Sequence, residues 1–234
     1  MDIVLAFTYI FDDEDWAGKV VMVVVWTLVS VIPLLGLIGA AALAGYVVEL
    51  VRNMQRGDAH PLPRWDNLGD KIMDGANVVI AAFVYNLGNF LVLCVAVLVP
   101  AFGITDSLGL ASGSGLMLIV SCCMGLFLLI YNLAVWPLLA VGVVHFSQTH
   151  EISAFFQFSR IFDTLSRNSG LTVQWILFSF LVSLGIGVIG AIPCCGWIAT
   201  LALTIPAQGH LLGQYAVQAG DKPKGKPKRD EVRR

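Results

Sequence analysis

Residues 115–144 read GLMLIVSCCMGLFLLIYNLAVWPLLAVGVV, a run of thirty residues without one charged side chain. About 20 apolar residues are enough for a helix to cross the hydrocarbon core of a bilayer. The rest of the chain has a similar character, because 57% of its 234 residues are hydrophobic, 13% are charged and the mean hydropathy is +0.80. Globular proteins average about 25% charged residues. The composition therefore predicts an all-α integral membrane protein.

Hydropathy predicts six apolar spans along the chain. They cover residues 16–34, 35–52, 77–99, 115–144, 171–192 and 196–217. The first two are short, at 19 and 18 residues, so a re-entrant hairpin is an alternative to two full crossings. The fourth is long enough to tilt in the membrane or to kink at Pro137.

Positively charged residues are distributed unevenly around these spans. The connections after the first, third and fifth spans contain no Lys or Arg, whereas the other two connections and the C-terminal tail contain most of them. Residues 1–15 contain none, and Lys19 and Arg52 lie at the predicted cytoplasmic ends of the first two spans. Cytoplasmic segments of membrane proteins carry an excess of Lys and Arg, so the distribution predicts that both termini are cytoplasmic. Residues 218–234 form a basic tail with seven Lys and Arg residues, for which we expect contact with anionic lipid headgroups.

Short motifs recur along the sequence and predict a threefold repeat. An I/V-P-x-x-G pattern occurs at residues 32–36, 99–103 and 192–196, and F-x-x-I-F-D occurs at 7–12 and 158–163, with a weaker copy at 72–74. Proline ends a helix, and glycine adopts backbone angles that other residues resist. We therefore expect one polytopic domain, residues 1–217, made of three parallel helix-plus-hairpin repeats over about 1–56, 57–147 and 148–217. Pro33, Pro100 and Pro193 are predicted to occupy equivalent outer turns.

Three stretches beside the spans have apolar residues at helical spacing, which is typical of amphipathic helices on a membrane surface. Either they lie in the cytoplasmic headgroup layer and orient the hairpins, or they dock a protein or lipid headgroups. Their apolar residues are Ile3, Phe7, Ile10 and Phe11, then Trp65, Leu68, Ile72 and Met73, and finally Phe155, Phe158, Ile161, Phe162 and Leu165.

The motifs F-D-D-E-D-W at residues 11–16 and L-P-x-W-D at 62–66 resemble those of an uncharacterised family of prokaryotic polytopic membrane proteins. The family is catalogued as a domain of unknown function, number four thousand and thirteen. Residues 154–168, 195–196 and 210–215 are similar to it as well. The resemblance implies a multi-pass protein of the bacterial or archaeal cell (inner) membrane, and it supplies no catalytic residue. After L-P-x-W-D the chain continues Asn67-Leu68-Gly69, where the family pattern implies a second acidic and aromatic pair.

Four consecutive carboxylates precede the first span and are the leading candidates for an interaction site. They cap the first span through its dipole, or bind a cation or a basic partner, or pair with Lys71, Arg160 or the tail. We expect capping by Asp12 or Asp13 and partner binding at Glu14 and Asp15. The candidate interface residues are Asp12, Asp13, Glu14, Asp15, Trp16, Trp65 and Asp66.

Polar residues inside the spans are a second set of candidates. We expect them to pair between helices, while a lined substrate or proton path is the alternative. This set contains Asn86, Asn89, Asn132, Gln174, Gln208, His210 and Gln214. Glu49 is predicted to pair with Arg52. The cysteines, at positions 94, 122, 123, 194 and 195, are interpreted as small buried hydrophobic residues.

No phosphate-binding loop, dinucleotide fingerprint, serine elbow or zinc motif occurs in the sequence. We therefore expect no cofactor, no metal, no nucleic-acid partner and no enzymatic activity. The first hypothesis is a scaffold or accessory subunit of a membrane complex, because the spans lack pairs of ionisable residues. A small transporter or lipid-handling protein is the alternative, and an intramembrane enzyme is the third hypothesis.

Overall fold

The structure is a computed structural model of the chain, and it describes residues 1–101, 115–192 and 196–220. Over these residues the chain forms helices joined by short connections and contains no strand, which confirms the all-α prediction. The elements are α1 (Leu5–Thr8), α2 (Trp16–Val31), α3 (Gly36–Arg56), α4 (Leu68–Tyr85), α5 (Leu87–Ala101), α7 (Gly115–Thr149), the 3-10 helix η1 (Ile152–Phe156), α8 (Phe158–Arg167), α9 (Ser169–Gly190) and α10 (Gly196–Gln218).

Three helices in the described part of the chain are long and apolar enough to cross a membrane. They are α3, residues Leu118–Thr149 of α7, and α9. A fourth crossing is obtained if α4 and α5 count as one broken span, since they are bent by 50° relative to each other. The apolar helix α2 is shorter, at 16 residues. The structure thus has the helices of a multi-pass membrane protein, while the number of six spans stays a prediction.

The observed helices differ from the predicted ones between residues 65 and 99 and include Pro137 in the fourth span. The predicted span 77–99 is divided at Asn86, and its first helix begins at Leu68, well before the expected start. Trp65, expected to be part of a helix with Leu68, lies in the connection before α4. For the fourth span we expected either a tilt in the membrane or a kink at Pro137. Helix α7 is assigned as one continuous helix that includes Pro137.

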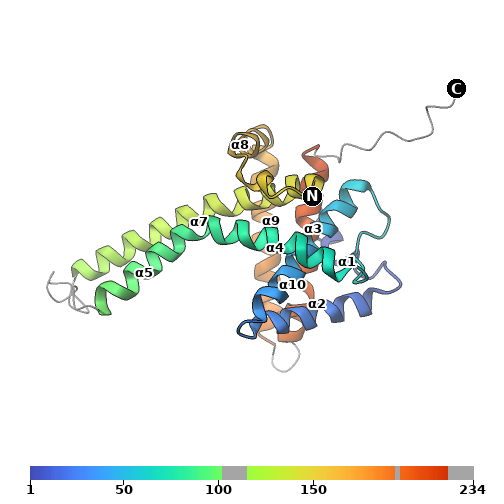
Figure 1. The fold of residues 1–234 in the computed structure, drawn as a ribbon, viewed down its shortest axis with the longest axis horizontal. Coiled ribbons are helices and arrows are strands. Elements are labelled where there is room, and N and C mark those ends of the chain that lie inside the picture. The colour runs from blue at the N-terminus through green and yellow to red at the C-terminus, as the bar shows by residue number, and fades with distance from the viewer. Residues whose placement is uncertain (102–114, 193–195, 221–234) are drawn as a thin grey trace. The chain divides into compact units, whose positions relative to one another are not determined.

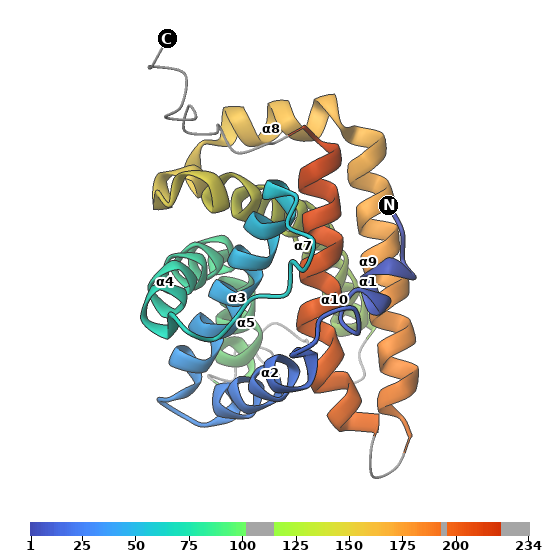
Figure 2. The ribbon, with the colours of Figure 1, turned by 90° about the vertical axis from the view of Figure 1, so that its right-hand side faces the viewer.

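The described residues form two compact units. The first unit contains Met1–Val79 and the chain from Ala140 onward, and the second unit is Ile80–Leu139. In the first unit, α10 lies between α3 and α9, and α8 runs across the end of α9 (Figure 2). Glycines allow the close packing of α10 on α3, because Gly209 lies against Leu50 and Gly213 against Met54.

The start of α4 crosses α3 with almost no side chain between the two backbones. A Cβ atom on Gly45 of α3 would collide with the backbone carbonyl of Lys71, and one on Gly75 of α4 would collide with that of Ala41. Glycine is the residue that permits so close an approach. This crossing decides which polar side chains of α3 and α4 meet.

The predicted repeat is not confirmed by the described residues. Pro33 lies in the turn between α2 and α3, but Pro100 lies inside α5, and Pro193 is outside the described residues. In the first turn it is Leu34 that has a positive φ, of 69°, while Gly36 provides room for the carbonyl of Ser30. The first F-x-x-I-F-D copy contributes to a helix of four residues, α1, whereas the last lies in the ten-residue α8.

The second unit is a helical hairpin in which α5 lies beside the first part of α7 (Figure 1). We call this pair, residues 87–101 and 115–139, the hairpin. Most of its large apolar side chains are exposed. Cys94, Cys122 and Cys123 are exposed too, so the prediction of buried cysteines is wrong for these three, because no other helix of the second unit covers them. Cys194 and Cys195 lie outside the described residues.

Candidate functional site

The N-terminal segment is held along α10 by two of the predicted polar residues. The side-chain amide of Gln214 accepts a hydrogen bond from the Asp2 N–H (2.7 Å) and donates one to the Asp2 carbonyl (2.8 Å). Further along, the Tyr9 ring stacks on His210 at 4.0 Å, and its hydroxyl donates to the Pro206 carbonyl (3.1 Å). Gln214 and His210 therefore bind the N-terminal segment and not another long helix.

The N-terminal segment runs along α10 from Gln214 toward Pro206, and the acidic residues come after this segment in the chain. From Gln214 to Pro206 the helix advances about 12 Å at 1.5 Å per residue, and Asp12 follows Tyr9 by three residues. Burial, and secondarily the proximity of Tyr46, raise the pKa of Tyr9 well above its usual value, so its hydroxyl remains a neutral donor. The expected surface helix over Ile3–Phe11 is thus reduced to the short α1, and Ile10 is buried.

Asp13 forms a buried ion pair with Lys19. The two side chains are 7% and 10% exposed, and the Lys19 ammonium lies 2.5 Å from the Asp13 carboxylate. Asp13 also accepts the Asp15 N–H at 3.0 Å, and Lys19 donates to the Leu62 carbonyl at 3.3 Å. Burial alone would raise the pKa of Asp13, but the hydrogen bonds from Lys19 and Asp15 and the charges of Lys19 and His60 outweigh it and hold the pKa below its usual value.

The predicted capping of the first span through its dipole stays a prediction, and the structure shows no side-chain cap hydrogen bond at the start of α2. Asp15 immediately precedes α2, and its side chain makes no cap hydrogen bond. Asp13 pairs with Lys19, which was not among the expected partners, and Asp12 is exposed. Trp16 packs edge-on against Phe11, with ring centroids 5.0 Å apart.

Two more ion pairs join α3 to the start of α4. The Lys71 ammonium, only 3% exposed, lies 2.5 Å from the Glu49 carboxylate, and Arg52 donates to Asp74 at 2.9 Å. Arg52 also donates to the Ser147 carbonyl at 3.0 Å. The predicted Glu49–Arg52 pair is therefore wrong. The glycine crossing brings Lys71 and Asp74 of α4 next to α3, where they take Glu49 and Arg52 as separate partners.

Trp65 fixes the connection between α3 and α4 against α2. Its ring stacks on Tyr46 and Trp26, at centroid distances of 5.3 and 6.3 Å, and its indole N–H donates to the Lys19 carbonyl at 3.0 Å. The Lys71 ammonium lies 6.0 Å from the ring centroid. Its neighbour Asp66 is exposed.

Two adjoining cavities lie around this cluster in the first unit. The first has a volume of about 530 Å³ and is lined by both buried lysines and by Asp13, Glu14, Asp15, Glu49, Asn53, His60, Leu62, Arg64, Asp66 and Asn67. The second, of about 610 Å³, is lined by Ala17, Gly18, Met22 and Trp65 and shares Glu14, Asp15, Lys19, Arg64 and Asp66 with the first. Five of the candidate interface residues, Asp13, Glu14, Asp15, Trp65 and Asp66, line these cavities, whereas Asp12 and Trp16 do not, and an interaction at them stays a prediction. No cluster of three or more metal-ligating side chains was found in the described residues.

Gln208 of α10 donates to the Ser179 carbonyl (3.0 Å) and to the Ser183 hydroxyl (2.9 Å) of α9, as expected for pairing between helices. Three more of the predicted polar residues, Asn86, Asn89 and Asn132, form a cluster in the second unit. The side-chain amides of Asn89 and Asn132 donate to each other at 3.0 Å, and Asn89 also donates to Asn86 at 2.8 Å. Asn86 lies at the break between α4 and α5, where Tyr131 donates its hydroxyl to the Tyr85 carbonyl at 2.7 Å. Sequence reasoning missed Tyr131, although a hydroxyl in an apolar run needs a partner.

The hairpin also has a groove beside these amides. It has a volume of about 530 Å³ and is lined by Asn89, Val92, Leu93, Ala96, Ser121, Met124, Gly125, Leu128 and Asn132. A smaller cavity of about 380 Å³ includes Asn86 and Asn132. Small side chains on both helices leave the groove open.

Comparison with known protein families identifies the family of the chain. The family model described as Protein of unknown function (DUF4013) matches residues 25–195. The chain belongs to this family. The DUF4013 match includes the L-P-x-W-D motif at 62–66 and begins after the acidic residues 12–15. No curated protein and no solved structure matches the chain.

Proposed function

We propose that this protein is a non-enzymatic accessory subunit of a prokaryotic cell-membrane complex, and that its hairpin binds a transmembrane helix of a partner protein. The observation that carries the proposal is the groove beside Asn89 and Asn132. Membrane helices associate through close packing over small residues and through interhelical hydrogen bonds. The hairpin offers both features on one surface.

The groove has room for the backbone of another helix. Ala96, Ser121 and Gly125 contribute little side-chain volume, and a Cβ atom placed on Gly125 would meet nothing within 4 Å. At one end, the exposed Asn132 amide donates to Asn89 and to the Leu128 carbonyl. A carboxamide oxygen has two lone pairs. The Asn132 oxygen accepts from Asn89, and its second lone pair suits a polar side chain of the partner helix.

The surface of the protein supports a membrane location with six crossings and cytoplasmic termini. Large apolar side chains are exposed on α2, α9 and both helices of the hairpin. The turn between α2 and α3, on the predicted outer side, has no charged residue. In α8, exposed Phe158 and Phe162 accompany exposed Arg160, Asp163 and Arg167, which suits a helix in the headgroup layer. We assign the basic tail to anionic lipid headgroups of the cytoplasmic leaflet.

A specific observation also favours the alternative, lipid binding. The two charged cavities of the first unit open next to the exposed apolar face of α2. This site is separate from the groove of the hairpin, so the two functions are compatible.

Gly125→Leu tests the proposed docking, because leucine adds volume to the groove while its Cβ atom meets nothing within 4 Å. Gly185→Leu on α9 is the matched control, since a Cβ atom there also meets nothing within 4 Å. The tagged protein is purified from native membranes in a gentle detergent, and associated proteins are quantified by mass spectrometry. We expect a stoichiometric membrane partner with the wild type and with Gly185→Leu, and its loss with Gly125→Leu.

A photocrosslinking residue at Ser121 provides a second measurement, with Ile130, which is outside the lining of the groove, as its control. We expect the partner to crosslink to position 121 and not to position 130. Absence of any partner, or its retention by Gly125→Leu, would contradict the proposal.

A further inference from the structure

We propose that the two adjoining cavities of the first unit bind one phospholipid with an amine-bearing, zwitterionic headgroup. The headgroup occupies the charged region that both cavities share, and the acyl chains leave along α2. This inference goes beyond the proposed subunit function and is independent of it, because it concerns the other unit of the chain.

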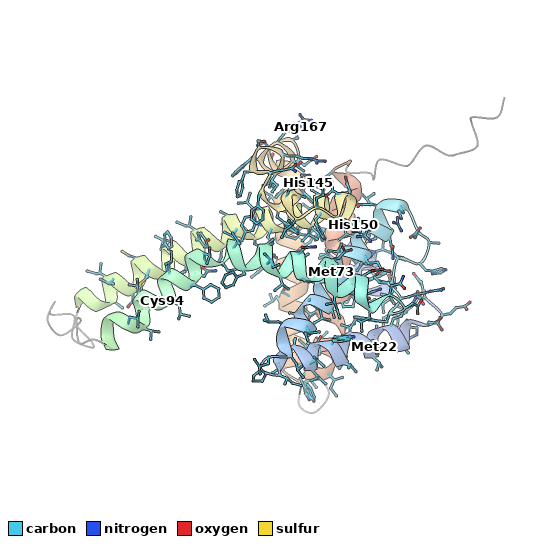
Figure 3. All side chains as sticks on the ribbon, viewed as in Figure 1. Met22, Met73, Cys94, His145, His150 and Arg167 are labelled. Atoms are coloured by element: carbon cyan, nitrogen blue, oxygen red, sulfur yellow. The ribbon has the colours of Figure 1, made fainter. Side chains whose placement is uncertain are left out.

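The lining is charged in the first cavity and partly apolar in the second, which suits a ligand that has a polar headgroup and apolar chains. The first cavity is lined almost entirely by charged and amide side chains, while the second reaches Ala17, Gly18 and Met22. Met22 lies on α2 at the periphery of the first unit (Figure 3), close to the exposed side chains of Val21 and Val25. Each cavity has a volume within the range of about 300–1,000 Å³ that is typical of ligand sites.

The charges available to a ligand are those at the rim. Lys19 and Lys71 are already neutralised by Asp13 and Glu49 in buried pairs. The exposed rim residues that line both cavities are Glu14, Asp15, Asp66 and Arg64, and none of these four has an ion pair in the described part of the chain.

These four side chains match the two charges of the headgroup. A guanidinium binds a phosphate through two parallel hydrogen bonds, so Arg64 suits the phosphodiester. The three carboxylates suit an ammonium group. Because carboxylates outnumber the free cation, the rim favours a headgroup with an amine, such as ethanolamine, over an anionic one, such as glycerol phosphate.

Gly18 provides a separate geometric argument. It is the third residue of α2, and glycine weakens a helix relative to alanine. A Cβ atom on Gly18 would meet nothing within 4 Å, so close packing does not require a glycine there. The absent side chain instead keeps the second cavity open between the charged rim and Met22.

The test is native mass spectrometry of the purified full chain in detergent, titrated with dioleoyl phosphatidylethanolamine or dioleoyl phosphatidylglycerol. Gly18→Leu fills the second cavity, and Gly69→Leu is its matched control, near the start of α4, where a Cβ atom also meets nothing within 4 Å. We expect one saturable phosphatidylethanolamine, and about tenfold weaker binding to Gly18→Leu than to the wild type or Gly69→Leu. Ala17→Leu replaces Gly18→Leu if the melting temperature shows that the latter does not fold.

Charge variants distinguish the two parts of the headgroup. Arg64→Gln should weaken both lipids, whereas Glu14→Gln combined with Asp66→Asn should weaken phosphatidylethanolamine alone and remove the preference for it. Equal affinity of the wild type for the two lipids would overturn the proposal. So would wild-type affinity in both cavity-filling variants, or binding without saturation, which would indicate an adventitious lipid only.

Discussion

Asp13→Asn removes the charge that neutralises Lys19 and changes little else. The amide oxygen of the new side chain can still accept the Asp15 N–H, now 3.0 Å from Asp13, so the turn before α2 is retained. Lys19 stays about nine-tenths buried and keeps only the Leu62 carbonyl, at 3.3 Å, among its present side-chain partners. The variant therefore measures the ion pair and not a helix cap.

Removal of one partner from a buried ion pair costs about 3–5 kcal/mol, because the other charge remains without compensation. The flexible Lys19 side chain borders both cavities and can move toward water, so we expect about 3 kcal/mol, at the lower end of the range. The double variant Asp13→Asn/Lys19→Met should recover most of this loss, since apolar replacement of a whole buried pair is often neutral. Asp12→Asn is the control and should change stability by less than about 0.5 kcal/mol, because Asp12 is exposed.

The assay is equilibrium unfolding in detergent micelles, followed by tryptophan fluorescence as a function of pH. Because the pKa of Asp13 is lowered in the folded state, the ion pair contributes its full stability above the ordinary Asp pKa of about 3.9. That contribution is lost as the pH falls further, so the difference between wild type and Asp13→Asn should shrink below about pH 4. A variant within about 1 kcal/mol of the wild type at pH 7 would refute the argument, since it would show that the pair is solvated.

Three further predictions concern the helix crossing, the break between α4 and α5, and the topology. Gly75→Ala should destabilise the protein by about 2 kcal/mol or more in thermal unfolding, because its Cβ atom collides with the Ala41 carbonyl, whereas Gly69→Ala should not. Tyr131→Phe should cost about 1 kcal/mol in the same assay, since it removes the donor to the Tyr85 carbonyl. In a cysteine-free background, a membrane-impermeant thiol reagent should label Leu34→Cys in intact cells and leave Asp58→Cys unlabelled; the reverse pattern would contradict cytoplasmic termini.

Local sequence was sufficient for the helical class and for several helix boundaries. The spans predicted at 171–192 and 196–217 correspond closely to α9, Ser169–Gly190, and α10, Gly196–Gln218. Long runs without charge adopt helices because every backbone polar group is then paired within its own segment. The family was also predicted from the sequence, and the model of that family, which matches residues 25–195, confirms it.

The sequence also singled out several residues that line the two cavities, because the adjacent carboxylates and L-P-x-W-D stand out in an apolar chain. Their partners were decided only by the tertiary structure. Gln214 binds Asp2 across 212 positions, and Lys71 binds Glu49 because Gly45 and Gly75 let α3 and α4 touch. Hydropathy averages over a window of neighbouring residues, whereas the choice of partner for a buried charge depends on which helices meet and at what depth. The partner of a buried charge is therefore decided by how distant segments pack together, and no single segment specifies it.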